Sequence, residues 1–157
     1  ALDLFEGAPK NLKSYDIIPL LFISLTIIAG TFVSGMDAGL VYNTFPYMGD
    51  GIIPIEYGNL GFIDPFENPV TAQFHHRLLA STTLIIIIIY SILYIIRNPI
   101  NLRILLLLFA IVCQFIIGIF TLLYSVPITL GAMHQFGGVL LFLSALWLLH
   151  SPKKNTF

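Results

Sequence analysis

Histidine is the residue type in this chain that could carry chemistry in an apolar environment. Four histidines occur, and three of them, His75, His76 and His134, lie within long segments that are otherwise almost free of charge. An ionisable side chain at such depth is costly, so its presence indicates a function. Imidazoles act there as metal ligands or as proton relays. A zinc site would need further ligands, and no Cys or acid lies at a compatible depth.

The elements that must position these histidines are membrane-spanning helices. Of the 157 residues, 57% are hydrophobic and 10% are charged, which excludes a disordered chain and argues against a soluble domain. Seven Lys and Arg against eight Asp and Glu leave no basic surface for nucleic acid. A span needs about 20 apolar residues, and lipid forces each span into a helix, because its backbone groups must bond internally. We therefore predict an all-α membrane protein, a bundle of four transmembrane helices at residues 17–36, 72–96, 104–124 and 130–150.

The segments between these helices predict the orientation of the bundle. Six of the seven cations fall in the inner segments 1–16, 97–103 and 151–157, and they are Lys10, Lys13, Arg97, Arg103, Lys153 and Lys154. The segment 37–71 has five acids and no Lys or Arg, and the segment 125–129 has no charged residue. By the positive-inside rule, both termini lie on the cytoplasmic or matrix side. The aromatic residues and prolines of segment 37–71 predict a structured outer loop at the headgroup level.

Two histidines from different helices are expected at equal depth. His76 lies in the first turns of the second span, and His134 lies in the first turns of the fourth, which runs in the same direction. This geometry favours a haem iron held between two imidazoles, while a proton-relay or transport site is the main alternative. His76 is preferred to His75 because it shares a helix face with Ala72, Ala80 and Thr83, although adjacent residues are only about 100° apart.

Residues near the two histidines have several candidate roles. Gly131, Gly137 and Gly138 could make room for a porphyrin, or could serve ordinary helix contacts in the membrane. Gln73 and Gln135 could accept a ring N–H, as the partners of metal-bound histidines do, or could bond each other.

Other polar residues also leave alternatives open. Arg77 could bind a haem propionate, pair with Glu67 or Asp64, or extend to lipid headgroups. His150 is expected to be a solvated residue at the inner end of the fourth span. Cys113, the only cysteine, cannot form an intrachain disulfide and is expected to be a small buried hydrophobe.

A short internal repeat relates the two halves of the chain. Residues 30–33 (GTFV) end the first span and residues 118–121 (GIFT) lie late in the third, and each precedes a span that opens with a candidate histidine. We therefore expect two pseudo-symmetric helical hairpins that place both histidines on one axis.

Three motifs resemble the C-terminal half of the haem A synthase family, in its mitochondrial and alphaproteobacterial type. They are residues 35–50 (GMDAGLVYNTFPYMGD), 73–80 (QFHHRLLA) and 134–135 (HQ), in the same order as in the family. The resemblance covers residues 17–150 and implies one half of an eight-helix, pseudo-symmetric protein. It also implies oxidation of the C8 methyl of haem O to the formyl of haem A, for the biogenesis of cytochrome c oxidase.

The resemblance further implies that His76 and His134 are the axial ligands of a haem b. From their positions near these histidines, Arg77, Gln73, Gln135 and Gly138 are further cofactor-binding candidates. The substrate haem O and the catalytic residues belong to the family's N-terminal half. Some members carry Cys pairs in their outer loops, and this chain has none there.

The sequence leaves partners and boundaries open. We expect a fragment of a longer protein, since the chain starts at Ala1 without a signal peptide. We expect membrane lipid to surround the helices, in a bacterial cell membrane or a mitochondrial inner membrane. Haem O synthase and oxidase assembly factors are candidate partners, while the electron donor and any homo-oligomer stay undetermined. The alternative functions are a bis-His b-type cytochrome subunit for quinol-linked electron transfer, and a transporter or assembly factor without haem.

Overall fold

The computed structural model describes residues 14–150 of the chain. Four long helices make up most of this part: α1 (Ile18–Gly35), α3 (Pro69–Arg97), α4 (Leu102–Leu123) and α5 (Ile128–Leu149). Each is long and apolar enough to cross a membrane. The prediction of an all-α, multi-pass membrane protein is thus confirmed. Expectations for residues 1–13 and 151–157 lie outside the described residues, and these include the four lysines of the orientation argument, Lys10, Lys13, Lys153 and Lys154.

Three of the four long helices begin earlier than predicted from the sequence, because polar caps and prolines fix their first turns. α3 begins at Pro69, not at residue 72, since the Asn68 side chain accepts hydrogen bonds from two N–H groups of the first turn. α4 begins at Leu102, not at residue 104, since Asn101 caps it in the same way. α5 begins two residues before the predicted start at 130, directly after a proline. Residues 69–71, assigned to the outer loop, are therefore helical.

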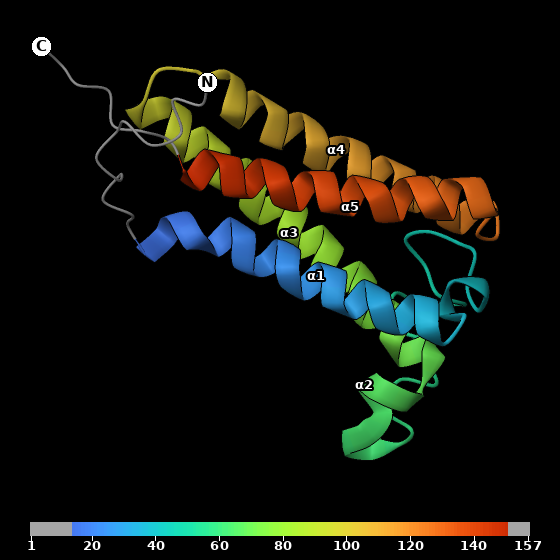
Figure 1. Ribbon diagram of the computed structural model, residues 1–157. Coiled ribbons are helices and arrows are strands. Elements are labelled where there is room, and N and C mark those ends of the chain that lie inside the picture. Colours follow the sequence, from blue (N-terminus) through green and yellow to red (C-terminus); the bar gives the residue numbers. More distant parts are fainter. Residues whose placement is uncertain (1–13, 151–157) are drawn as a thin grey trace, which may run out of the picture.

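The four helices form two antiparallel hairpins, α1 with α3 and α4 with α5 (Figure 1). The hairpins contact each other through α3 with α4 and through α1 with α5. A polar seam joins α1 to α3, where the hydroxyl oxygens of Thr26 and Thr83 lie 2.7 Å apart. Hydroxyl bonds of this kind stabilise helix pairs in lipid, where apolar surfaces alone give no net attraction.

An apolar core fills the inner half of the bundle, nearer to the link between α3 and α4. All four helices contribute buried residues to it, and these are Ile23, Ile87, Ile104, Leu107, Ile111, Leu141, Ala145 and Leu148. At the inner end, the Tyr90 hydroxyl donates to Asp16 at 3.0 Å. The Arg103 guanidinium lies 5.1 Å from the centre of the Trp147 ring. Cys113, expected to be buried, is only half-buried on α4, so that prediction was wrong in degree.

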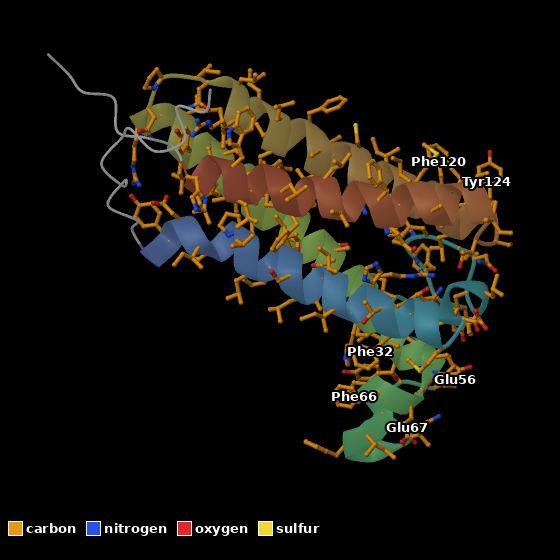
Figure 2. The ribbon with its side chains drawn as sticks, viewed as in Figure 1. Phe32, Glu56, Phe66, Glu67, Phe120 and Tyr124 are labelled. Carbon is orange, nitrogen blue, oxygen red and sulfur yellow. The ribbon has the colours of Figure 1, made fainter. Side chains whose placement is uncertain are left out.

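The outer connection between α1 and α3 has three short helical segments, namely η2 (Ala38–Leu40), η3 (Gly61–Ile63) and α2 (Asp64–Glu67). α2 lies apart from the bundle, beyond the outer end of α3 (Figure 1). Phe66 on α2 makes an edge-to-face contact with Phe32 of α1, with ring centres 5.4 Å apart (Figure 2). This contact ties α2 to the first hairpin.

Asp64 organises the base of this outer segment. It is 1% exposed. Burial alone would raise its pKa, but hydrogen bonds from Thr71, Asn68 and the N–H groups of Leu60 and Gly58 lower the pKa to about 2. Asp64 therefore stays ionised and holds the turn before α2 against the first turn of α3.

A second part of the outer loop reaches the other hairpin. The Asn43 side chain donates to the carbonyl of Gly39 at 2.8 Å and to that of Leu122, on α4, at 2.9 Å. The rings of Phe45 and Phe115 contact each other edge to face, with centres 6.1 Å apart. The loop thus connects both hairpins at the outer end of the bundle.

Candidate functional site

His76 on α3 and His134 on α5 face each other between the two hairpins. Their ring centres lie 6.3 Å apart, and the ring planes are nearly perpendicular at 87°. Both side chains are half-buried in the outer half of the bundle. The structure therefore brings together the two histidines that the sequence places at equal depth, one from each hairpin.

The first hairpin holds His76 through its backbone. Nδ1 of His76 lies 3.2 Å from the carbonyl oxygen of Thr26 on α1. Because a carbonyl can only accept, Nδ1 must carry the ring proton of the neutral imidazole, and Nε2 keeps a free lone pair. Gly30, one turn further along α1, lies against the same ring: a Cβ there would be 3.1 Å from Cε1 of His76. Glycine thus provides room for the imidazole.

The second hairpin repeats this plan with a side chain in place of the carbonyl. Nε2 of Gln114, on α4, lies 3.1 Å from Nδ1 of His134 and donates to the His134 carbonyl at 2.7 Å. Gly118, one turn further along α4, faces the ring, and a Cβ there would be 2.7 Å from Cε1 of His134. The two glycines are the ones that open the internal repeat, and the two hairpins share the expected arrangement around their histidines.

Gln114 was not predicted from the sequence. A signal for it exists in the repeat, because Gln114 precedes Gly118 by four residues, as Thr26 precedes Gly30. Residues four apart lie on the same helix face. A search for polar residues one turn before each glycine would have found Gln114.

The glycines around His134 have other neighbours than those expected. A Cβ at Gly137 would overlap Oε1 of Gln114, and one at Gly138 would lie 3.5 Å from its Nε2. Gly138 also approaches Ile27 of α1. A Cβ at Gly131 would lie 3.8 Å from the Val126 side chain. Gly137 and Gly138 therefore accommodate the Gln114 amide.

Arg77 and Gln73 both bind the outer loop. The Arg77 guanidinium donates to the carbonyls of Tyr42 at 2.7 Å and Thr44 at 2.8 Å, and its Nε is buried without a partner within residues 14–150. Nε2 of Gln73, a residue 2% exposed, donates to the same Tyr42 carbonyl at 3.0 Å. Arg77 thus makes contacts that none of the three sequence alternatives included, because the loop folds back over the start of α3.

The remaining candidates lie away from the two facing rings. The amide nitrogen of Gln135 donates to the Ser34 hydroxyl at 3.4 Å, so Gln135 and Gln73 do not bond each other. Nε2 of His75 lies 3.2 Å from the Tyr57 hydroxyl, on the exposed side of α3. His150 is exposed just after α5, with Nδ1 3.0 Å from the carbonyl of Leu146.

An apolar groove of about 290 Å³ lies between α1 and α5, and its lining residues are Ser24, Ile27, Ile28, Val139 and Phe142. Its Ile27 side chain is the one that approaches Gly138 next to Gln114. Within residues 14–150, no three His, Cys, Asp or Glu side chains gather closely enough to hold a bare metal ion. The site therefore offers two imidazoles and an adjoining apolar surface.

Comparison with known proteins places this chain in a family. The family model COX15-CtaA, described as cytochrome oxidase assembly protein, matches residues 5–146. This chain belongs to that family. No solved structure matches the chain.

Several curated relatives of this family member carry the name Heme A synthase. The one from Wolbachia pipientis wMel is 38% identical over 151 residues, which cover 93% of this chain and 41% of the relative. The one from Granulibacter bethesdensis is 40% identical over 159 residues, which cover 96% of this chain and 42% of the relative. The one from Rickettsia bellii strain OSU 85-389 is 40% identical over 147 residues, which cover 90% of this chain and 43% of the relative. The chain therefore spans about two fifths of the length of these relatives. None of these matches supports the alternative of a quinol-linked cytochrome subunit.

The long motif that carries the family resemblance, residues 35–50, holds the loop to the site helix. Its Tyr42 provides the carbonyl that both Arg77 and Gln73 bind. The Tyr42 hydroxyl donates to the carboxylate of Glu56 at 2.9 Å, and this hydrogen bond, together with burial, raises the pKa of Tyr42. Tyr42 therefore bonds to α3 through its carbonyl and to Glu56 of the outer loop through its hydroxyl. The two α3 residues that it binds, Gln73 and Arg77, lie on either side of His76 in the sequence.

Proposed function

We propose that this chain is the haem-bearing C-terminal half of a haem A synthase. Its relatives of that name match nearly the whole chain. In this proposal the parent protein oxidises the C8 methyl of haem O to the formyl of haem A, and this half holds a haem b with His76 and His134 as axial ligands. The observation that carries the proposal is the contact of these two imidazoles across the hairpin interface.

The dimensions of the site fit a single iron between the two rings. A metal–imidazole bond is about 2 Å long. Two such bonds, with the distance from each nitrogen to its ring centre, would add up to roughly the observed separation of 6.3 Å. Each Nδ1 is engaged within its own hairpin, and neither Nε2 has a hydrogen-bond partner within residues 14–150. Nε2 of each ring is therefore the nitrogen left for a ligand.

The surroundings also suit a large apolar cofactor. The groove between α1 and α5 adjoins the His134 partner and is almost wholly apolar. Its volume of about 290 Å³ is near the lower end of the range of ligand pockets.

The chain's own residues would orient and insulate the group. When bound, haem b supplies one-electron chemistry, whose potential depends on axial ligands, burial and hydrogen bonds. The Thr26 carbonyl fixes the tautomer of His76, and Gly30 and Gly118 let both rings lie close to the facing helices. Arg77 and Gln73 hold the outer loop against the start of α3, next to His76 in the sequence.

We also propose the orientation in the membrane. Arg97 and Arg103 lie at the end of the bundle opposite the outer loop, and the loop carries the acids Asp37, Asp50 and Glu56. The positive-inside rule puts the arginine end on the cytoplasmic or matrix side. The histidine pair then lies near the opposite face of an inner membrane.

Reduced-minus-oxidised absorption spectra test the proposed function. The protein is extracted from membranes in mild detergent, and a low-spin b-type band is expected. His76→Ala and His134→Ala should each abolish that band, since each removes one of two axial ligands. Replacement by glycine with added imidazole should restore it, which separates loss of a ligand from loss of the fold.

His75→Ala and His150→Ala are the matched controls. His75 lies on α3 beside His76, and His150 lies directly after α5, the helix of His134. Neither contacts the two facing imidazoles. Both variants should keep the band. A normal band in His76→Ala or His134→Ala, or no band in the unmodified protein, would overturn the proposed function.

A further inference from the structure

The hydrogen-bond roles at His134 are set by the carbonyl oxygen of the same residue. The Gln114 amide atom that lies 2.7 Å from this oxygen must be nitrogen, because two oxygens at that distance would repel each other. The same NH₂ group lies 3.1 Å from Nδ1 of His134, and an amide NH₂ group can donate a hydrogen bond but cannot accept one. Nδ1 is therefore an acceptor, and the proton of the neutral ring lies on Nε2.

This arrangement conflicts with ligation of His134 through Nε2. A metal-bound nitrogen has no proton, so the ring must carry its proton on Nδ1 and donate it to an acceptor. The Gln114 NH₂ group would then oppose an N–H group. His76 has no such conflict, since the Thr26 carbonyl is already an acceptor at its Nδ1.

Gln114 has an unused acceptor close by. Its Oε1 is buried and has no hydrogen-bond partner within residues 14–150. A buried amide oxygen without a partner is unfavourable, because it has lost its hydrogen bonds to water. It lies in a recess formed by the missing side chains of Gly137 and Gly138, where a Cβ at residue 137 would overlap it. The amide end thus has a polar atom to spare, and two glycines leave room around it.

We infer that Gln114 is a positioning residue whose amide turns when His134 binds the iron. The inference rests on the proposed function. The amide releases the His134 carbonyl and turns Oε1 toward Nδ1. The ring proton would move from Nε2 to Nδ1, which would leave the lone pair of Nε2 available to hold an iron, and no net proton would be taken up. His76 is the preset ligand, and His134 is the adjustable one, whose basicity Gln114 controls.

Two substitutions test this role through the midpoint potential of the bound haem. Gln114→Glu provides a carboxylate, which can only accept and should strengthen the Nδ1–H bond, so the potential should fall. Gln114→Leu keeps the approximate shape without an acceptor, so the potential should rise and haem affinity should fall about 10- to 100-fold. Thr121→Val is the matched control, since Thr121 also joins α4 to an α5 carbonyl, that of Leu130 at 3.3 Å, and contacts no imidazole.

The tautomer of His134 provides a readout that needs no haem. In haem-free protein with ¹⁵N-labelled histidine, nitrogen NMR should show the proton of His134 on Nε2, with the signal assigned by its loss in His134→Ala. In Gln114→Glu the proton should move to Nδ1. A proton on Nδ1 in the unmodified haem-free protein would overturn the inference even if no haem binds.

An unchanged potential and affinity in Gln114→Leu would also overturn it, whereas the proposed function would then survive. Absence of any bis-His spectrum in the unmodified protein, with the predicted tautomers observed, would overturn the proposed function alone.

Discussion

The two hairpins of this protein hold their histidines by the same plan with different parts. In each, a histidine on the second helix lies against a glycine on the first, and its Nδ1 partner lies one turn before that glycine. The two sets are Thr26, Gly30 and His76, and Gln114, Gly118 and His134. The first partner is a backbone carbonyl, which is fixed by its helix, and the second is a side-chain amide, which can turn. A pseudo-symmetric pair of hairpins can therefore hold one histidine by a fixed partner and the other by a partner that can turn.

The connections of the two hairpins differ as well. Residues 36–68 join α1 to α3, and Arg77, Gln73 and Asn68 tie this loop to α3 by side-chain bonds. Residues 124–127 join α4 to α5 in a tight turn, in which Ser125 and Val126 both have left-handed backbone angles, with φ of 57° and 54°. This is an unfavourable conformation for a β-branched residue. Order in the long loop thus depends on side chains, and order in the short turn depends on the backbone.

The largest effect should come from filling the glycine contact at His134, and the corresponding contact at His76 provides the comparison. Gly118→Ala puts a Cβ 2.7 Å from the His134 ring, and Gly30→Ala puts one 3.1 Å from the His76 ring. Overpacking costs about 1–3 kcal/mol, while Ala gains up to about 1 kcal/mol of helix propensity over Gly. We expect Gly118→Ala to lower the melting temperature in detergent clearly, and Gly30→Ala to leave it nearly unchanged.

Gly35→Ala is the control for these variants, because a Cβ there meets nothing within 4 Å. It should be neutral or slightly stabilising. Equal losses in Gly118→Ala and Gly30→Ala would show that the two histidine contacts are not packed differently.

A smaller effect is expected from the tie between the long loop and its hairpin. Arg77→Gln removes the charge-assisted bonds to the Tyr42 and Thr44 carbonyls, and such bonds are worth about 1.5–3 kcal/mol. Hydrogen exchange of residues 42–47 should become roughly tenfold faster, which corresponds to about 1.4 kcal/mol. Exchange in the turn 124–127 should stay unchanged.

Arg97→Gln is the control for this loop, since Arg97 lies at the other end of the same helix. It should leave exchange of residues 42–47 as in the unmodified protein. If Arg77→Gln does so too, the loop depends on its other contacts, and the contrast between the connections is weaker than the hydrogen bonds indicate.

The smallest effect is expected at the partner of His76. Thr26→Val removes the hydroxyl that lies 2.7 Å from that of Thr83 and keeps the backbone carbonyl at Nδ1 of His76. Bonds of this kind between membrane helices average about 0.6 kcal/mol. The melting temperature should fall slightly, and the haem potential should not move. A shift as large as that of Gln114→Leu would show that the first hairpin is not the rigid one.

Much of the fold could be predicted from the sequence, because the uncharged segments between Asp16 and Asp37 and between Arg77 and Arg97 mark spans directly. The helix starts were placed late, since Asn68 and Asn101 act as caps through side-chain geometry that an apolar pattern does not contain. The role of Arg77 could not be predicted, because its partners are backbone carbonyls of Tyr42 and Thr44, which have no signature in the sequence.

The sequence by itself determined four membrane helices, two of them with a histidine at matching depth, since the cost of charge and of unbonded backbone groups in lipid allows few other solutions. Only the tertiary structure decided which atoms hold the two imidazoles. Gln114 and Gly118 meet His134 through the packing angle of α4 on α5, and the Thr26 carbonyl meets His76 through that of α1 on α3. These contacts depend on side-chain volumes across interfaces between helices, and no single segment of sequence contains that information.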